Sequence, residues 1–235
     1  MLNDFNIQYV SNIMFPCLLS TFMTIGMTTL SPVKSRREEY SEATREALLT
    51  AARTLFVAGG YQQVGIEAIA KAARVTRGAF YHHFTDKAAL FEALVVALQA
   101  DAAERIRAIA GERAQIWDRL LAGVAAFLDI FAEPAYLRLV IEDAPSVLGL
   151  ARCRRIEEQF TIGLMMGAFA DLRAAGEINV DDPNLAARMI AAMICQAALM
   201  LVDAADAPQM RRSALNLIER MLMDLREPRQ GARSD

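Results

Sequence analysis

The stretch RVTRGAFYHHF, residues 74–84, contains both histidines of this 235-residue chain and gives the first indication of its fold. Thr76 is a favourable N-cap residue, so the stretch predicts a short helix over residues 77–83. Phe80 and Phe84 lie four residues apart and therefore share one face of that helix. We expect this aromatic face to pack against the neighbouring helices.

The opposite face of the same helix is polar. It presents a cation, a bare backbone, a phenol and an imidazole, and no aliphatic side chain, from Arg77, Gly78, Tyr81 and His82. Long hydrogen-bond donors beside a glycine that permits close approach are typical of a helix that enters the major groove of DNA. We therefore interpret residues 77–83 as a recognition helix.

The adjacent pair His82-His83 admits other interpretations. Neighbouring side chains on a helix point about 100° apart, and no third ligand lies nearby, so the pattern disfavours a metal site. A catalytic pair would need a carboxylate or a nucleophile, for which only Asp86 is close in the sequence. We expect His82 to face solvent or DNA, and His83 to turn partly toward the core.

The segments around this stretch predict a helix-turn-helix layout. Apolar residues spaced three and four apart predict helices over residues 41–58 and 65–72, the first of them ended by Gly59-Gly60. A tight connector, Arg74-Val75, separates the second helix from the recognition helix. Three short helices followed by a long one over residues 87–110 form the expected DNA-binding arrangement.

The remainder of the chain shows helical patterns only, so the predicted fold class is all-α. Further helices are expected over residues 116–131, 135–142, 152–175, 184–202 and 209–226. Neither strand-type alternation nor an internal repeat occurs. The expected organisation is a disordered or mis-annotated leader, a helix-turn-helix domain, a larger helical domain and a flexible tail, over residues 1–33, 34–86, 87–226 and 227–235.

Composition and charge support a folded protein with one local site for an anionic partner. Hydrophobic residues make up 54% of the chain, which argues against overall disorder. Residues 34–87 carry nine Lys or Arg and six Asp or Glu, whereas residues 88–235 carry sixteen and twenty-one. A basic module on an acidic body suits DNA, although an excess of this size also arises by chance. Three widely spaced cysteines disfavour a disulfide framework and fit a cytoplasmic location.

The first thirty residues differ from the rest because they contain no Lys or Arg. A signal peptide would have a positively charged start. Asn12, Pro16 and Gly26 interrupt the apolar run, which is shorter than the ~20 residues of a membrane-spanning helix. We expect translation to begin at Met23 or Met27, with a loose extension or a membrane anchor as the alternatives.

Residues 41–91 resemble the N-terminal DNA-binding domain of the tetracycline-repressor (TetR/AcrR) family of transcriptional regulators. The remaining helices are similar to the ligand-binding and dimerisation domain of that family only in their pattern. The resemblance rests on Ala51-Ala52, Leu55-Phe56, Gly60-Tyr61, Ile69-Ala70, Ala73, Val75-Thr76, the run from Arg77 to Phe84, Lys87 and Leu90-Phe91.

Two positions depart from the family pattern. Val64-Gly65 stands where the family usually has Thr or Ser, which removes an N-cap, although the backbone N–H of Gly65 can still serve a phosphate. Arg74 replaces the turn glycine, so a positive φ there would cost about 1 kcal/mol, while its charge can add a cation near DNA. The expected DNA-binding residues are Gly65, Arg74, Thr76, Arg77, Gly78, Tyr81, His82 and Lys87.

The resemblance also implies a ligand-sensing cavity in the larger domain. Methionine repacks easily around a ligand, and apolar pockets are rich in aromatic side chains. Each candidate, taken by itself, is more often an ordinary core residue. The residues expected to line the pocket are Trp117, Phe127, Phe131, Tyr136, Phe160, Met165, Met166 and Phe169. The expected ligand is a small, largely apolar inducer whose identity the sequence does not give.

The expected function is that of a repressor that leaves a palindromic operator when this ligand binds, with no enzymatic activity, cofactor or metal. The helix over residues 184–202 is too apolar for the surface of a monomer, which favours homodimerisation through the last two helices over burial within one subunit. The rival hypotheses are an all-helical enzyme that uses His82, His83 and Asp86, and a membrane-tethered helical adaptor that uses residues 5–25.

Overall fold

The computed structural model describes residues 35–226, and the first helix within them, α2, spans Arg36–Gln63. It begins five residues before the predicted start. The predicted stop at Gly59-Gly60 is a kink, because Gly60 takes φ 72° and ψ 160° and leaves the helical path. The expectations for the leader and for the tail lie outside the described residues.

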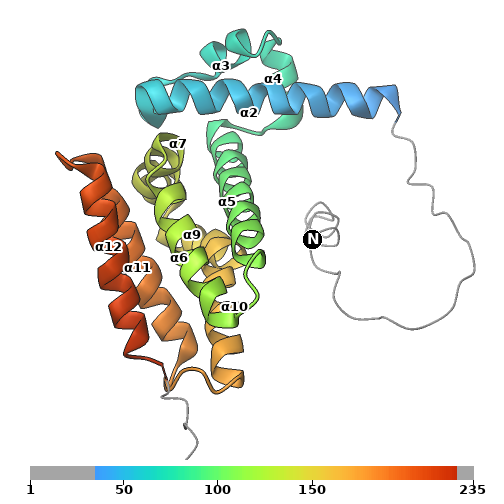
Figure 1. Ribbon diagram of the computed structural model, residues 1–235. Coiled ribbons are helices and arrows are strands. Elements are labelled where there is room, and N and C mark those ends of the chain that lie inside the picture. Colours follow the sequence, from blue (N-terminus) through green and yellow to red (C-terminus); the bar gives the residue numbers. More distant parts are fainter. Residues whose placement is uncertain (1–34, 227–235) are drawn as a thin grey trace, which may run out of the picture. The chain divides into compact units, whose positions relative to one another are not determined.

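Three further helices complete the predicted helix-turn-helix arrangement: α3 spans Ile66–Ala72, α4 spans Arg77–His83 and α5 spans Lys87–Gly111. The side chain of Thr76 accepts a hydrogen bond from the backbone N–H of Ala79 at 3.1 Å, as expected of an N-cap. Asp86 caps α5 in the same way, through the N–H of Ala89 at 2.7 Å. Figure 1 shows α3 and α4 lying together along α2.

Aromatic side chains form the core of this region. The rings of Phe56, Tyr61 and Phe91 lie with their centroids 5.0 to 5.6 Å apart, so the first turns of α5 are joined to α2. Phe80 and Phe84 are 0% and 5% exposed, which confirms the predicted inner face of α4. Burial of these rings fixes the orientation of the polar face on the other side.

The larger part of the chain is a bundle of helices in which α5 packs on α6 and α10 on α11 (Figure 1). Its elements after α5 are α6 Ile116–Phe131, α7 Pro134–Tyr136, η1 Leu137–Asp143, α8 Ala144–Leu148, α9 Leu150–Gln159, α10 Thr161–Ala174, α11 Pro183–Val202 and α12 Ala207–Met223. Residues 35–226 contain no strand, only an isolated bridge between Ile178 and Arg226. The all-α prediction is confirmed.

Two predicted helices of this bundle are wrong in detail. The single helix expected over residues 152–175 is broken at Phe160, whose φ of −120° and ψ of −97° are not helical. Gly163 permits the break, since a Cβ there would lie 2.2 Å from the carbonyl oxygen of Glu158. The short helix expected over residues 135–142 falls on two segments, α7 and the π-helix η1, and α8 continues directly after them.

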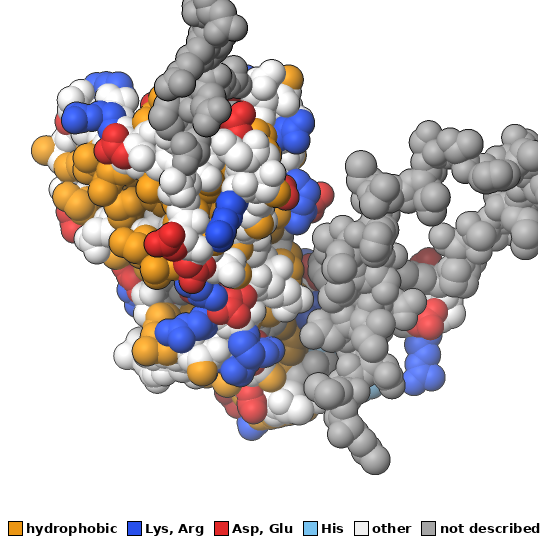
Figure 2. Space-filling view, turned by 90° about the horizontal axis from the view of Figure 1, so that it is seen from below, with side chains coloured by type: hydrophobic (Ala, Val, Ile, Leu, Met, Phe, Trp, Pro, Cys, Tyr) orange, Lys and Arg blue, Asp and Glu red, His pale blue; other side chains and the backbone are white. Residues whose placement is uncertain are grey.

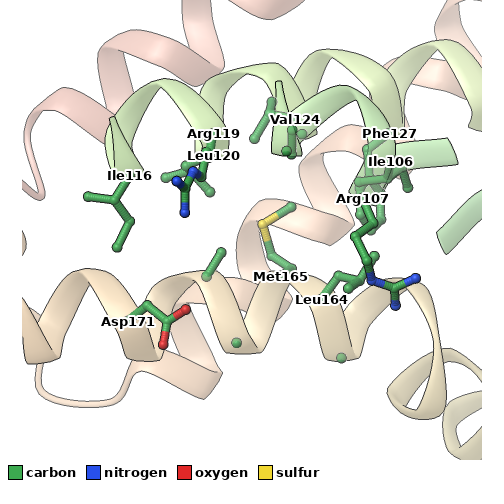
Figure 3. Close-up of a pocket in the computed structure, with 16 residues that line it drawn as sticks. Ile106, Arg107, Ile116, Arg119, Leu120, Val124, Phe127, Leu164, Met165 and Asp171 are labelled. Atoms are coloured by element: carbon green, nitrogen blue, oxygen red, sulfur yellow. The ribbon is translucent and has the colours of Figure 1, made fainter. Parts of the chain in front are cut away.

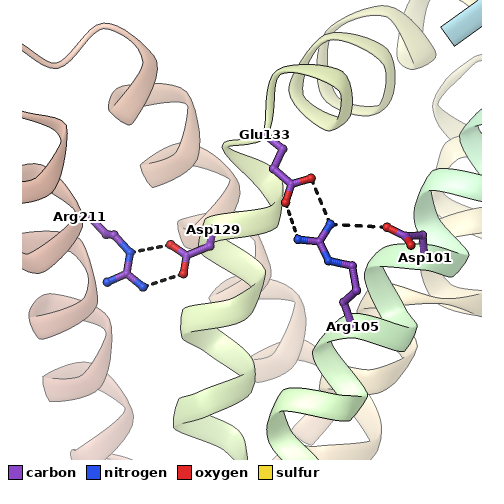
Figure 4. A network of polar contacts seen from close by, with 5 residues as sticks. All are labelled: Asp101, Arg105, Asp129, Glu133 and Arg211. Carbon is purple, nitrogen blue, oxygen red and sulfur yellow. Dashed lines mark hydrogen bonds and ion pairs between the residues drawn. The ribbon is translucent and has the colours of Figure 1, made fainter.

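Ion pairs on the surface join α5, α6 and α12 (Figure 4). Arg211 of α12 donates two hydrogen bonds to the carboxylate of Asp129 of α6, at 2.5 and 2.7 Å. Arg105 of α5 pairs with Glu133, just beyond α6, and with Asp101 at 3.5 Å. Exposed pairs contribute little individually, roughly 0.2–1 kcal/mol, so burial of the apolar side chains stabilises the bundle more than these pairs do.

Candidate nucleic-acid interface and ligand cavity

The outer face of α4 carries the polar residues that the sequence places there. Arg77, Gly78, Tyr81 and His82 are all exposed, with Tyr81 at 45%. A Cβ added at Gly78 would meet only the hydroxyl oxygen of Thr76, at 3.7 Å, so this stretch of backbone is open to a partner. This outer face of α4, called the ridge below, therefore carries the hydrogen-bond donors Arg77, Tyr81 and His82 around Gly78, which has no side chain.

Arg77 is held along this ridge by two neighbours. Its guanidinium pairs with the carboxylate of Glu67 on α3 at 2.7 Å and donates to the hydroxyl of Tyr81 at 3.3 Å. Both Arg77 and Glu67 are more than 60% exposed, so the pair is screened by water and contributes little to stability. An incoming phosphate or guanine can therefore replace Glu67 at low cost.

The two histidines differ as the sequence predicts. His82 is exposed and His83 is half-buried, with their rings 5.2 Å apart and nearly perpendicular. Partial burial, together with the charges of His82 and Arg45, lowers the pKa of His83. The carboxylate of Asp86 caps α5, and neither histidine lines the cavity described below. This arrangement gives no support to the hypothesis of an enzyme.

Arg74 has φ 58°, the one positive φ among the non-glycine residues of the described chain. The sequence-based expectation of strain at this turn is therefore confirmed. A side chain in this conformation costs about 1–2 kcal/mol, and the turn directly precedes the recognition helix. The exposed guanidinium adds a cation beside α4.

Arg74→Gly is therefore expected to raise the free energy of unfolding by up to about 1 kcal/mol, since the relief of strain exceeds the entropy that glycine loses on folding. Chemical denaturation measures this change. Arg74→Ala removes the same charge but keeps the Cβ, so its stability should stay near that of the parent. Equal stability of the two variants would contradict a strained turn at Arg74.

The entry to α3 has no side-chain cap. Gly65 occupies the N-cap position with φ −92° and ψ 159°, and no side chain bonds to the first N–H groups of the helix. Gly65 itself is exposed. The sequence-based prediction that they contact a phosphate stays a prediction.

Lys87, the first residue of α5, has partners inside the protein. Its ammonium donates to the carbonyl oxygens of Tyr61 at 2.9 Å and Val64 at 3.1 Å, and lies 4.1 Å from the centroid of the Tyr61 ring. Two of its three N–H groups are thus used at the end of α2. Sequence reasoning placed Lys87 on DNA, and missed this role because the pairing is tertiary.

A cavity of about 410 Å³ lies between α5, α6 and α10 (Figure 3). This volume falls within the range of about 300–1,000 Å³ that small-molecule sites occupy. Arg107, Arg119 and Asp171 are the charged residues of its wall. Most of the remaining wall is apolar, including Ile116, Leu120, Val124, Phe127, Leu164 and Met165.

Only two of the eight residues predicted to line the pocket, Phe127 and Met165, line this cavity. Phe131 stacks on Tyr136 with the ring centroids 4.7 Å apart, and burial raises the pKa of the Tyr136 hydroxyl. Trp117 lies beneath the guanidinium of Arg226, 4.9 Å away. Three others also lie outside the lining: Phe160 at the helix break, half-buried Met166 and fully buried Phe169.

The cavity instead forms where side chains are small. Four glycines line it: Gly111, Gly123, Gly163 and Gly167. Sequence reasoning looked for large apolar residues, which fill the core. Glycine inside a helix destabilises it by roughly 1 kcal/mol relative to alanine. The glycines of α6 and α10 were therefore the sequence signal that could have located the cavity.

Comparison with known proteins finds a matching family for both parts of the chain. Residues 48–94 match the family described as "Bacterial regulatory proteins, tetR family", and residues 117–225 match "Tetracyclin repressor-like, C-terminal domain". A crystal structure of a TetR-family transcriptional regulator from Pectobacterium atrosepticum is 30% identical, with a TM-score of 0.66 over 83% of this chain and 100% of that one.

Two curated relatives show where the similarity is concentrated. The transposon Tn10 TetC protein of Escherichia coli is 47% identical over 60 residues, which is 26% of this chain and 30% of that protein. An HTH-type transcriptional repressor of Mycobacterium tuberculosis is 27% identical over 192 residues, which is 77% of this chain and 94% of the repressor. The match to TetC therefore covers less than a third of that relative.

Proposed function

Because the chain belongs to the TetR family of bacterial regulatory proteins, we propose that it is a transcriptional repressor that a small ligand releases from DNA. The family consists of DNA-binding regulators. The observation that carries the proposal for this chain is the outer face of α4, with its exposed donors around a bare Gly78. In this proposal the protein acts in the cytoplasm, which contains the bacterial DNA.

In this proposal α4 lies in the major groove of the operator. Arg77, Tyr81 and His82 face the base edges and the flanking phosphates, and Arg74 and the N-terminus of α3 contact the backbone. Fluorescence anisotropy with DNA from upstream of the protein's own gene tests this assignment. The expected result is sequence-specific binding whose affinity falls as salt rises. Lack of any specific binding would overturn the proposal.

We further propose that the protein forms a homodimer through α11 and α12. Large hydrophobic side chains on these two helices are between 45% and 61% exposed, namely Leu185, Met189, Met200, Val202, Leu217, Met221 and Met223. Figure 2 shows hydrophobic side chains gathered at the left, the side where α11 and α12 lie in Figure 1. Monomeric soluble proteins rarely expose a patch of this kind.

Among the described residues, α11 has the length and composition of a membrane-spanning helix, with 28% of its most apolar window buried. A helix at a protein interface passes the same test of composition. Its neighbour α12 also carries charged residues, and two of its arginines, Arg211 and Arg212, make hydrogen bonds within the protein. We therefore assign the exposed apolar side of α11 to a second copy of this chain.

In this proposal, the ligand would release the protein from DNA through α5. The last turns of α5, including Ile106 and Gly111, line the cavity, while its first residue, Lys87, holds the end of α2. The larger domain contacts the same end of α2 a second time, where Asp143 of η1 accepts a hydrogen bond from the backbone N–H of Tyr61 at 3.3 Å. A ligand that prefers the released arrangement by about 1–3 kcal/mol is sufficient for regulation.

Lys87→Met is expected to lower the free energy of unfolding by about 2 kcal/mol, because it removes two charge-assisted hydrogen bonds and a cation–π contact. DNA affinity should fall as well, since α2 and α5 lose their junction. Lys71→Met is a matched control that removes a charge from an exposed position on α3. If Lys87 contacted only a phosphate, Lys87→Met would leave the unfolding curve unchanged.

A further inference from the structure

Four glycines leave room in the cavity between α5, α6 and α10, and only one of them, Gly163, has a packing reason to be a glycine. A Cβ at Gly163 would lie 2.2 Å from the carbonyl oxygen of Glu158, so that position needs a glycine. A Cβ at Gly167, one turn later on α10, would meet no heavy atom within 4 Å. Since alanine is the better helix former, the absence of a side chain at Gly167 preserves space.

The charged residues divide the cavity into two unlike ends. Figure 3 shows Arg119 and Asp171 on opposite walls at one end, and Arg107 beside Leu164 at the other. Arg119 donates to the backbone carbonyls of Arg113 at 2.8 Å and Ala114 at 3.3 Å, which holds it in place. This end therefore carries one cation and one anion on opposite walls, without a hydrogen bond or ion pair between these two side chains.

The other end carries an unbalanced positive charge. The guanidinium of Arg107 makes no hydrogen bond or ion pair with any described residue, although its side chain belongs to the wall of the cavity. The space between Arg107 and the Arg119–Asp171 end is bounded by apolar residues, among them Val124, Leu120 and Met165. The cavity thus has an apolar middle and, at one end, an arginine without a partner among the described residues.

We propose that this cavity binds an elongated apolar molecule with a single carboxylate, whose carboxylate pairs with Arg107 and whose chain lies along Val124, Leu120 and Met165. This proposal rests on the assignment of the cavity as the ligand site in the function proposed above. The planar guanidinium presents two parallel N–H groups that match the two oxygens of a carboxylate. Asp171 is the single carboxylate of the wall and lies opposite Arg119, so the two arginines make the wall as a whole favour an anion over a cation.

Isothermal titration calorimetry of the full-length protein with decanoate, 1-decanol and decylammonium tests the charge preference. Decanoate should bind more tightly than both other probes, about fivefold more tightly than decanol, as expected for one exposed ion pair. Arg107→Gln should remove this advantage and leave decanol binding unchanged. Equal or tighter binding of decylammonium, or a decanoate affinity that Arg107→Gln does not change, would overturn the proposal.

The size of the site is tested with Gly167. Gly167→Leu places a side chain in the cavity and should weaken decanoate binding more than tenfold, whereas Gly167→Ala should retain most of the affinity. Unchanged binding by Gly167→Leu would show that the chain does not occupy this cavity. A melting temperature no lower than that of the parent confirms that both variants fold.

DNA binding measured without any probe distinguishes a failure of the proposed ligand class from a failure of the proposed repressor function. The parent, Arg107→Gln and Gly167→Leu proteins should bind the same operator fragment equally well. If the parent fails to bind DNA, the proposed function is wrong and the measured ligand preference still stands. If it binds DNA but none of the probes, only the assignment of the ligand class is wrong.

Discussion

Gly78→Leu should abolish specific DNA binding while the protein stays folded. Inside the protein a Cβ at this position would meet only Thr76, at an ordinary contact distance of 3.7 Å. On the outside, the larger side chain would hold the backbone of α4 away from the base edges. The contacts of Arg77 and Tyr81 with DNA would then be lost together, which amounts to roughly 30-fold or more in affinity at about 1–3 kcal/mol for each base contact.

Anisotropy measurements with an operator fragment, paired with thermal unfolding, test this expectation. Gly78→Ala is the graded control, since a methyl group should weaken binding much less than an isobutyl group. Ala108→Leu adds the same bulk at an exposed position of α5, remote in sequence from α4, and should leave DNA binding unchanged. Full affinity in the Gly78→Leu protein, with its melting temperature unchanged, would show that α4 does not enter the groove.

Met189→Glu combined with Leu217→Glu should convert the protein into a monomer. These side chains of α11 and α12 are 61% and 58% exposed in the single chain, so their replacement does not disturb its core. At a dimer interface the same carboxylates would be buried without partners, at a cost of several kcal/mol for each charge. Affinity for a palindromic operator should fall with the dimer, because each half-site would be bound separately.

Light scattering coupled to size exclusion measures the mass of each variant. Ile109→Glu is the matched control, because Ile109 is an exposed hydrophobic residue, at 41%, that lies on α5. It should leave the dimer intact. A double variant that elutes as a dimer would place the interface on another surface and would contradict the role assigned to the exposed side chains of α11 and α12.

The DNA-binding region could be predicted closely because its signals are local. The cap at Thr76, the spacing of Phe80 and Phe84, and the residue type at Arg74 all act within a few positions along the chain. The bounds of α4 agree with the prediction for this reason. The kink at Gly60 is also local, although the helix continues in a new direction for three more residues.

The larger domain could be predicted only as a set of helices. The break at Phe160 depends on the turn that Gly163 permits against the carbonyl of Glu158, and the apolar periodicity runs across it unchanged. The partners of Lys87 lie 23 and 26 residues away in the sequence, so no local pattern reveals them. Tertiary packing also decided which apolar residues became core and which became the cavity wall.

The cavity illustrates why the site was harder to predict than the fold. Phe131, Tyr136 and Phe169 are large and apolar, and they fill the core because burial of their rings stabilises it. A ligand site needs space, which is marked by missing side chains such as that of Gly167. The sequence-based prediction selected large apolar residues, and most of these pack in the core and do not line the cavity.

Selection of bound sequences from random DNA shows whether the protein binds DNA as a dimer through α4. A dimer that places one α4 helix in each of two major grooves predicts an enriched palindrome, with half-sites about one helical turn apart or slightly more. The Gly78→Leu protein should enrich nothing under the same conditions. Enrichment of a single, non-repeated site, or no enrichment by the parent protein, would contradict the account.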